Sequence, residues 1–473
     1  MTTVNNYASY RPEDHGLPGI LELGEKIAAY FPEFAPAASV AYNPKVVSAE
    51  SSKTFRTDGD KYGASSAERV GGVPVSEIRA DFPILSERVG GKPLIWLDNA
   101  ATTQRPRQVI ERIVRYYERE NSNTHRGAHT LAARSTDAYE VARRKVADFI
   151  GAASPDNIIF TRGTTEGLNL VAQSYVKRRL RPGDEIILTI LEHHANIVPW
   201  QMIAEETGAA LKIAPVDETG QIILPEYAAL FTPRVKFASI TQVSNALGVI
   251  TPTAEMVAIA HSFGTPVCVD GAQSVSHMPV SVAGLDADFF VFSGHKVFGP
   301  NGIGAVYGKS EPLEEARPYQ GGGNMIEDVT FERTTYKKAP AKFEAGTGNI
   351  AAAVGLGAAI DYVTAIGMEN IESYERSLLE YAVRELSAVP GLRLIGSAAQ
   401  RAGVISFVME GRETEEIGDF LNAAGIAVRA GHHCAQPILR RFGLESTARP
   451  SLAFYNVKGE IDALAERLES PPR

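Results

Sequence analysis

The sequence predicts an α/β protein with a largely parallel sheet, followed by a smaller C-terminal α+β unit. From about residue 77 onward, short hydrophobic runs alternate with helical stretches, a pattern typical of parallel sheets. The length of 473 residues exceeds what one hydrophobic core usually supports, so two folded units are expected. Polar residues suited to ligand binding follow the ends of several strands, the edge at which open α/β sheets bind ligands.

The predicted elements follow this alternation. The strands of the sheet region are Asn157–Thr161, Glu185–Ile190, Ala210–Ala214, Val235–Ile240, Pro266–Asp270 and Phe289–Phe292. The helices between them include Thr165–Lys177, Ile197–Glu206 and Thr253–Ser262. The tract Ile350–Ser387 predicts long helices that bridge to the C-terminal unit. That unit is expected to contain the strands Leu392–Ile395, Val404–Val408, Ile426–Arg429 and Ser451–Tyr455 and the helices Thr414–Ala424 and Glu460–Leu468.

The first 75 residues differ in character from the rest. Residues 17–31 carry apolar side chains at helical spacing, whereas residues 37–72 are small, polar and aperiodic, a composition that cannot offset the entropy of ordering. We therefore predict a largely disordered extension over 1–75, a large domain over 76–350 whose N-terminal segment packs on the small domain, and bridging helices with a small domain over 351–473. The extension is either a tail without a role or a docking segment for a partner groove.

Composition excludes several classes of protein. The formal charge of −9 argues against nucleic-acid binding, and no apolar run approaches the ~20 residues of a membrane helix. The N-terminus lacks the pattern of a secretory signal. Two cysteines, Cys268 and Cys434, exclude a disulfide framework and fit a reducing cytoplasm. Two adjacent histidine pairs lack ligand-like spacing, so no metal site is predicted.

The most informative segment runs from Phe292 to Gly304. It places Lys296 in a glycine-rich turn at the end of a hydrophobic strand, where a lysine can form a Schiff base with a planar aldehyde cofactor. Ser293 and His295 stand beside it and can donate to a phosphate group. Ser-x-His-Lys alone is weakly specific, so the interpretation depends on what the other strand ends supply.

Four other strand ends supply compatible chemistry. Thr164 and Thr165 open a helix after a strand, where free N–H groups and the helix dipole favour phosphate; a plain N-cap accounts for one threonine equally well. Asp270 ends another strand and can keep a pyridine nitrogen protonated, although it can also cap a turn. His193 can stack on a cofactor ring or move protons, and Asn245 can hydrogen-bond ring substituents.

A single cysteine completes the set. Cys434 lies in the polar segment Arg429–Pro437, where it can act as a thiolate nucleophile; the alternative is a solvent-facing cysteine without a role. Cys268 lies inside a predicted strand and is expected to be buried and inert.

These segments resemble the class V aminotransferase family of fold-type I pyridoxal phosphate (PLP) enzymes, and within it the group II (SUF-type) cysteine desulfurases and their selenocysteine lyase relatives. The resemblance extends from about Ile78 to the C-terminus. It is carried by 97–101, 124–129, 162–169, 192–200, 270–273, 293–300, 343–347 and 429–437. It implies a mostly parallel seven-stranded sheet, PLP as cofactor and a homodimer.

The resemblance also implies roles around the cofactor. Lys296 would bind the aldehyde, Asp270 the pyridine nitrogen and Gln273 the ring hydroxyl, with His193 stacked on the ring. The phosphate would be bound by Thr164, Thr165, Ser293 and His295, and by Gly346 and Thr347 from the second subunit.

For the substrate, the resemblance implies that Asn245 and Arg449 bind the carboxylate, with Arg429 in the cysteine loop and Arg126 near the active site of the other subunit. Two positions depart from the family pattern. Gly348 replaces a proline of the usual Gly-Thr-Pro-Asn, and Pro450 follows Arg449 where the family has alanine. Gly348 puts the precision of the cross-subunit phosphate contact in question.

The implied reaction converts L-cysteine to L-alanine and leaves a persulfide on Cys434, which a sulfur-acceptor protein or a thiol reductant removes. Selenocysteine lyase activity is the enzymatic alternative, and a cargo or scaffold protein is the alternative from a different class. The long extension resembles those of desulfurases packaged in encapsulins, the capsid-like protein shells of bacteria. It therefore implies a shell protein as a partner of residues 1–75 and a location in the cytoplasm, inside such a compartment.

Overall fold

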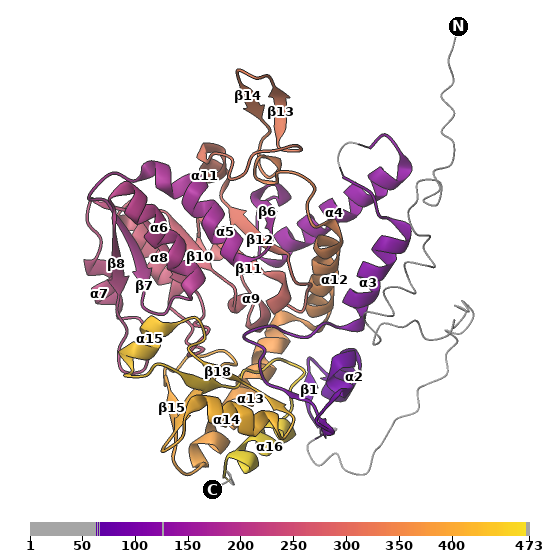
Figure 1. Cartoon of the computed structure of the whole chain (residues 1–473), viewed down its shortest axis with the longest axis vertical. Helices are drawn as coiled ribbons and strands as arrows, with labels where there is room; N and C mark the ends of the chain where they lie inside the picture. Colours follow the sequence, from indigo (N-terminus) through magenta and orange to yellow (C-terminus); the bar gives the residue numbers. More distant parts are fainter. Residues whose placement is uncertain (1–62, 64, 66, 125–126, 470–473) are drawn as a thin grey trace, which may run out of the picture. The chain divides into compact units, whose positions relative to one another are not determined.

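The computed structural model describes residues 63, 65, 67–124 and 127–469 of the chain. Most of the predicted extension over 1–75, and Arg126, lie outside these residues. The described part centres on a seven-stranded sheet (Figure 1), called here the large sheet. Its strands are β6 (Ile158–Thr161), β7 (Glu185–Thr189), β8 (Ala210–Ala214), β9 (Val235–Thr241), β10 (Val267–Asp270), β11 (Phe289–Ser293) and β12 (Gly304–Gly308).

The large sheet has the order β6-β12-β11-β10-β9-β7-β8. Neighbours from β11 through β10, β9 and β7 to β8 are parallel, whereas β12 is antiparallel to both β11 and β6. The predicted fold class, a mostly parallel seven-stranded sheet of fold-type I, is confirmed. Because the parallel strands end at one edge, residues that follow β7, β9, β10 and β11 are brought together there.

Helices pack against the large sheet and against one another. The side chains of every residue in β6, β7, β10, β11 and β12 are buried, as expected for strands covered on both faces. These helices include α3 (Arg107–Arg119), α4 (Thr130–Phe149), α5 (Thr164–Val171), α6 (Val198–Thr207), α7 (Leu224–Ala229), α8 (Thr253–Ser262), α9 (Ser274–His277), α10 (Val282–Leu285) and α11 (Ser310–Glu315). In Figure 1, the hairpin of β13 (Ile326–Val329) and β14 (Thr334–Tyr336) projects from this body.

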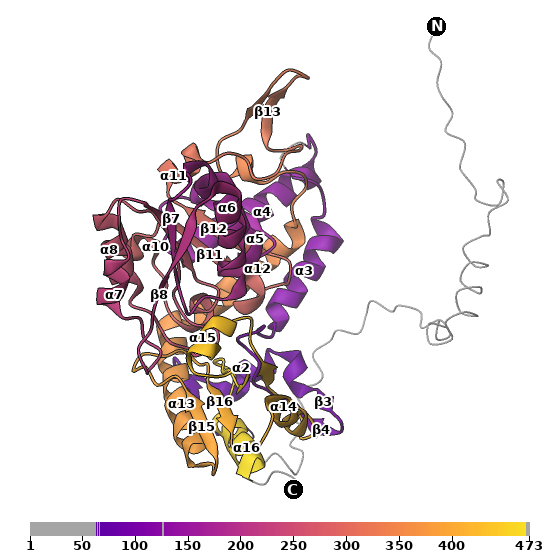
Figure 2. The ribbon, with the colours of Figure 1, turned by 60° about the vertical axis from the view of Figure 1, so that its left-hand side comes forward.

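The C-terminal part forms a four-stranded sheet, called here the small sheet, with the order β15-β16-β19-β18. It lies beside α13 and α16 in the views of Figures 1 and 2. Its elements and the bridging helices are α12 (Ile350–Ile366), α13 (Met368–Ala388), β15 (Leu392–Ile395), β16 (Ser406–Met409), α14 (Thr414–Asn422), β18 (Arg429–Gly431), α15 (Gln436–Arg441), β19 (Thr447–Arg449) and α16 (Lys458–Glu469).

An N-terminal segment joins this C-terminal part. Strand β5 (Ile95–Trp96) pairs in parallel with β17 (Ile426–Ala427), and α2 (Val75–Ala80) precedes it. The remaining short elements are β1 (Arg69–Val70), β2 (Val73–Pro74), β3 (Arg88–Val89) and β4 (Lys92–Pro93). This pairing places residues 97–101 beside the small sheet, close to the edge where the large strands end.

The structure differs from the sequence expectations in four elements. The predicted strand Ser451–Tyr455 is wrong: β19 comes earlier, and the buried apolar run bends into a turn because the Asn456 side chain accepts a hydrogen bond from Ala453 N–H (2.8 Å). The predicted strand Ile426–Arg429 divides into β17 and β18, which belong to different sheets. Helix Thr165–Lys177 begins one residue earlier and continues after Val171 as a π-helical turn. Strand β12 was not anticipated.

Within the described residues, no single helix is long and apolar enough to cross a membrane. Helices α12 and α13 have the length and composition of a membrane span only when they are taken together, and this pair is bent by 73°.

Candidate active site

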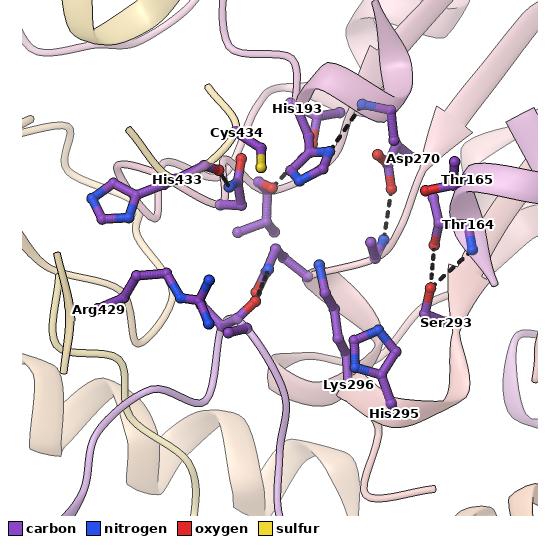
Figure 3. Close-up of a pocket in the computed structure, with 18 of the residues that line it drawn as sticks. Thr164, Thr165, His193, Asp270, Ser293, His295, Lys296, Arg429, His433 and Cys434 are labelled. Carbon is purple, nitrogen blue, oxygen red and sulfur yellow. Dashed lines mark hydrogen bonds between the residues drawn. The ribbon is translucent and has the colours of Figure 1, made fainter. Parts of the chain in front are cut away.

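A cavity of about 260 Å³ lies where the large strands end, and residues of the cysteine-bearing segment line it. Its lining includes most of the residues singled out from the sequence. They are Thr164, Thr165, His193, Asn245, Asp270, Gln273, Ser293, His295, Lys296, Arg429, Cys434 and Arg449. Figure 3 shows the Lys296 amine and the Cys434 sulfur directed into the same space from opposite sides. The fold thus gathers into one cavity residues that are far apart in the sequence.

Two predicted groups are not placed in this cavity. Gly346 and Thr347 are exposed and do not line it. Arg126 lies outside the described residues.

The hydroxyl cluster at one end of the cavity forms because α5 begins at Thr164, directly after β6 and the glycine turn. Thr164 N–H donates to Ser293 Oγ (2.8 Å), and the two hydroxyl oxygens lie 2.9 Å apart. Gly163 has a φ of 152°, and a Cβ at that position would lie 3.0 Å from Ser293 Oγ. Any side chain at position 163 would crowd Ser293 Oγ, so only glycine leaves the space beside the hydroxyls open. The Thr164 and Ser293 hydroxyls and the N-terminus of α5 form a cradle that suits a phosphate.

Lys296 reaches the cavity from η8 (Gly294–Lys296), the turn after β11. Burial lowers the pKa of Lys296 to about 8, although the negative charge of Asp270 opposes this shift. Asp270 ends the neighbouring strand β10, and burial raises its pKa. One of its oxygens accepts from Ala272 N–H (2.9 Å). The amine of the half-buried Lys296 and the buried carboxyl of Asp270 therefore line one space without a direct hydrogen bond between them.

Two histidines of the cavity are held as neutral rings. Burial, with the positive charge of Lys296, lowers the pKa of His193 to about 3 and that of His295 to about 4. His193 Nδ1 accepts from Ala195 N–H (3.0 Å), so the neutral ring carries its proton on Nε2. His295 Nδ1 lies 3.2 Å from Thr102 Oγ1.

The cysteine loop, residues 431–434, is held by contacts from outside it. His194 N–H donates to the Cys434 carbonyl oxygen (2.7 Å), and the Asn245 amide donates to the His433 carbonyl oxygen (2.7 Å). The His433 ring lies 2.8 Å from Thr447 Oγ1. Both His433 (φ 52°) and Cys434 (φ 55°) have left-handed backbone conformations, which non-glycine residues adopt only where the surroundings impose them.

The residues around Cys434 differ in the positive charge that they can supply to its thiol. His433 faces away, toward Thr447, and burial lowers its pKa so that it is neutral. It therefore supplies no positive charge to the thiol. His432 Nδ1 accepts from Cys434 N–H (3.0 Å), and the cationic side chain of Arg429 lines the cavity with Cys434.

Sequence reasoning missed two acidic residues of the site. Asp98 accepts from Arg429 (Nη2 to Oδ2, 3.0 Å) and from Arg449 (Nη2 to Oδ1, 3.3 Å), which ties both arginines to one carboxylate. Glu192 is fully buried directly before His193. Both lie inside segments that carried the family resemblance, at 97–101 and 192–200, but only the pairing of β5 with β17 and the fold of the turn after β7 reveal their partners.

This donor set fits PLP: a hydroxyl-lined helix N-terminus for a phosphate, an amine for an aldehyde and a carboxyl for a pyridine nitrogen. The open cradle at Gly163 supports the fit independently of any motif. Among the described residues, no group of three or more histidine, cysteine, aspartate or glutamate side chains is arranged to hold a metal ion.

Comparison with known proteins agrees with this geometry. Residues 95–464 match the model of the class V aminotransferase family. A cysteine desulfurase of Synechococcus elongatus is 62% identical over 403 residues, which cover 85% of this chain and 64% of that protein. The chain likewise spans only 57% and 65% of two mycobacterial relatives. A cysteine desulfurase of Pectobacterium atrosepticum is 48% identical, over 84% of this chain and 97% of the relative.

Solved structures show the same likeness. A cysteine desulfurase from Escherichia coli superposes with a TM-score of 0.78 at 41% identity, covering 84% of this chain and 97% of the other. The apo cysteine desulfurase from Thermococcus onnurineus gives a TM-score of 0.80 at 36% identity, covering 86% and 98%. From the matched family model and these extensive identities, the chain belongs to the class V aminotransferase family, and these relatives are cysteine desulfurases.

Proposed function

We propose that this chain releases L-alanine from L-cysteine and keeps the sulfur as a persulfide on Cys434. One observation carries the proposal: Lys296, from the end of the large sheet, and Cys434, from the segment before α15, line the same cavity of about 260 Å³. A lysine alone would suit many PLP enzymes, whereas a thiol opposite it suits attack on a sulfur atom of the substrate.

The cofactor would be held by Lys296 at its aldehyde, by Asp270 at its ring nitrogen and by the Thr164–Ser293 cradle at its phosphate. Gln273, His295 and Thr165 line the same space, and the neutral His193 ring would stack on the cofactor. When bound, PLP supplies an electron sink that stabilises negative charge at the substrate α-carbon.

The residues of the chain supply the remaining chemistry. A lysine whose pKa is lowered to about 8 is neutral in part of the molecules near neutral pH, so Lys296 can remove the α-proton. Arg449 and Asn245 would bind the substrate carboxylate. The Cys434 thiolate then attacks the substrate sulfur: an S–S bond forms and the C–S bond breaks with its electron pair on the β-carbon. The β-carbon then takes a proton, and the α-carbon regains the proton removed by Lys296, which gives alanine.

The test measures alanine and protein-bound sulfur from L-cysteine, with and without a reductant. We expect about one persulfide per chain without reductant and continuous alanine release with it. Cys434→Ser should abolish desulfuration, while any cleavage of L-selenocysteine by the same variant would show that Lys296 and the cofactor remain competent. Desulfuration that persists in Cys434→Ser contradicts the proposed role of the thiol.

We also propose a homodimer of the group II type. Exposed apolar side chains on α3 and α4 support it, namely Ile110, Val114, Tyr117, Leu131 and Val141. In this proposal Gly346, Thr347 and Arg126 act in the cavity of the partner subunit. Mixing Lys296→Ala subunits with Thr347→Ala subunits should then yield dimers with one intact cavity and restored activity, which separate monomers would not give.

For the extension, we propose that residues 1–75 dock the enzyme to an encapsulin shell in the cytoplasm, and that the domain boundaries lie near residues 75 and 350. The sulfur would pass to an acceptor protein or thiol at the cavity mouth. Full-length chain should co-purify with a co-expressed shell protein and the chain lacking 1–75 should not. Equal co-purification of both would refute the docking role.

A further inference from the structure

Glu192 is a buried carboxyl that the proposed chemistry does not use. Its side chain is 0% exposed, yet it accepts three hydrogen bonds. Thr189 Oγ1 donates to Oε1 (2.7 Å), Thr241 N–H donates to Oε1 (2.9 Å) and the Asn196 amide donates to Oε2 (2.6 Å).

The surroundings act on this carboxyl in opposite directions. Burial raises the pKa of Glu192 to about 8, and each of the three hydrogen bonds opposes that rise. The Asn196 amide and the Thr241 N–H can only donate, so both carboxyl oxygens serve as acceptors. A buried carboxyl is a costly feature of a fold, and three donors converging on it indicate that it holds something in place.

The three donors come from different elements. Thr189 is the last residue of β7, Thr241 the last residue of β9, and Asn196 ends η7 (His194–Asn196). Glu192 therefore ties the turn between β7 and α6 to the ends of two strands. Thr241 itself lines the cavity, so the tie lies directly beneath the proposed cofactor site.

The orientation of Asn196 is fixed by its other partners. Its Oδ1 accepts from Trp200 Nε1 (2.8 Å) and from Ser239 Oγ (2.6 Å). Because an indole N–H can only donate, Oδ1 must face Trp200 and the amide nitrogen must face Glu192. Turning the amide over would lose the bond from Trp200 and would set the amide oxygen against the Glu192 carboxyl. The Glu192–Asn196 pair consequently has a single allowed arrangement of acceptor and donor.

The turn that Glu192 holds carries two groups that act in the cavity. His193 follows it directly and lines the cavity. His194 supplies the N–H that donates to the Cys434 carbonyl oxygen (2.7 Å). A shift of this turn would therefore displace the ring expected over the cofactor and, at the same time, release the cysteine loop.

We propose that Glu192, through its bond with Asn196, is a positioning residue that sets both the His193 ring and the Cys434 loop. The role of each group in catalysis rests on the proposed function, whereas the coupling itself is a property of the folded chain. It links the cofactor side of the cavity to the nucleophile side through one buried carboxyl.

The pair can be tested by exchanging donor and acceptor. In Glu192→Gln, the new amide nitrogen can take either of the two positions of the carboxyl oxygens. In one position it faces the Asn196 amide and in the other the Thr241 N–H, so a donor faces a donor in both cases. Asn196→Asp sets two carboxyl oxygens together, which requires a shared proton. The double variant Glu192→Gln/Asn196→Asp restores a donor facing an acceptor, and the introduced aspartate can still accept from Trp200 and Ser239. All four proteins have nearly identical side-chain volumes.

The main readout is the alkylation rate of Cys434 in the PLP-loaded protein. The chain has only two cysteines, and Cys268 is 0% exposed with its pKa raised by burial, so modification of the folded protein reports Cys434 alone. The visible circular dichroism of the cofactor reports the ring environment. A third readout, kcat/KM for L-cysteine, follows the reaction.

We expect Glu192→Gln to change the alkylation rate and to lower kcat/KM by about tenfold to a hundredfold, the scale of a mispaired buried polar group. Asn196→Asp should lose activity progressively as pH rises and the shared proton leaves. The double variant should return all three readouts to within about threefold of the parent.

The matched control is Glu375→Gln. Glu375 is also a buried carboxyl, bonded to His277 Nδ1 (2.6 Å), and it does not line the active-site cavity. The Glu375→Gln variant should lower the melting temperature without changing the rate of Cys434 alkylation or the cofactor spectrum. Two results overturn the proposal. In the first, Glu192→Gln and Asn196→Asp behave like Glu375→Gln; in the second, the double variant differs from the parent in the three readouts as much as the single variants do. Absence of desulfuration in the parent protein would refute the proposed function but leave the alkylation result decisive for Glu192.

Discussion

The two sides of the cavity are built in different ways. On the lysine side, Lys296 follows β11 and Asp270 ends β10, and their positions result from regular parallel strands ending at one edge. On the cysteine side, His433 and Cys434 have left-handed backbone conformations with φ of 52° and 55°. That loop is held by Asn245 and His194, which follow strands of the large sheet.

The difference shows where the structure stores conformational strain. A left-handed non-glycine residue costs on the order of 1 kcal/mol, and two stand in succession at Cys434, the proposed nucleophile. The hydrogen bonds to the loop offset that cost only while the large sheet and the C-terminal segment remain together. The lysine side should therefore tolerate disturbance of the loop, whereas the cysteine should be sensitive to its supports.

The largest effect is expected from Lys296→Ala, which breaks the lysine side alone. In the proposed mechanism, loss of the amine removes both the covalent anchor of the cofactor and the base for the α-proton. We expect activity to fall by about a thousandfold or more, the scale of removing a principal catalytic group. The cofactor absorbance band should disappear, while Cys434 alkylation stays near the parent rate. A changed alkylation rate would show that the two sides are not independent in this direction.

The position of the lysine side could be predicted because it follows from the alternation of strands and helices along the sequence. Hydrophobic runs alternating with helices imply parallel strands, and parallel strands imply that the residues after β7, β9, β10 and β11 converge. The geometry of the cysteine side could not be predicted in this way. Its geometry depends on hydrogen bonds such as that from Asn245 to His433, 188 positions apart. A sequence pattern that identifies Cys434 as a candidate nucleophile contains no sign of its left-handed backbone.

Asp98 and Glu192 illustrate the same limit. Neither received a role from the sequence, because each acts through partners that are distant in the chain or buried beneath the turn after β7. Strand β12 escaped prediction because an antiparallel strand inserted between β6 and β11 interrupts the expected alternation. The Ser451–Tyr455 run was misassigned because its hydrophobicity reflects burial in a turn rather than pairing.

The next largest effect concerns the stability of the cofactor-free protein. Because burial lowers the pKa of Lys296 from its ordinary value of 10.5 to about 8, the unfolded chain binds more protons than the folded one between these values, and stability rises with pH there. Below pH 8 the charged amine destabilises the fold, by on the order of 3 kcal/mol. Lys296→Met should therefore stabilise the apoprotein at pH 7, with the gain shrinking toward pH 10.

Urea unfolding of both apoproteins at pH 7 and pH 9.5 measures this difference. Lys309→Met is a suitable control, since ion pairing with Asp286 and Asp288 raises the pKa of that lysine and its replacement should not stabilise the protein. A gain for Lys296→Met that is equal at both pH values would instead indicate a packing effect.

Asp98→Asn sharpens the comparison because Asp98 ties two arginines of the small sheet to the segment after β5. Its carboxylate accepts from Arg429, at the start of β18, and from Arg449, at the end of β19. Losing its charge leaves both guanidinium groups poorly oriented, so we expect kcat/KM for L-cysteine to fall about tenfold, mainly through KM, as for one hydrogen bond to a charged group. A cofactor spectrum that stays unchanged while KM rises would support an effect on substrate binding; an unchanged KM would contradict it.

The smallest effect is expected from Thr447→Val, which removes one support of the cysteine loop without touching the cavity. Thr447 is fully buried, and its hydroxyl lies 2.8 Å from His433 Nε2. Valine keeps the shape but leaves the imidazole nitrogen unpaired, so the loop should sample other conformations and the rate of persulfide formation should fall about threefold to fivefold. Single-turnover kinetics resolve this step, and Thr414→Val, another buried threonine outside the cavity lining, should leave it unchanged. If Thr447→Val lowers the melting temperature yet forms persulfide at the parent rate, the left-handed loop is held by Asn245 and His194 alone, and the nucleophile depends on the large sheet rather than on the small one.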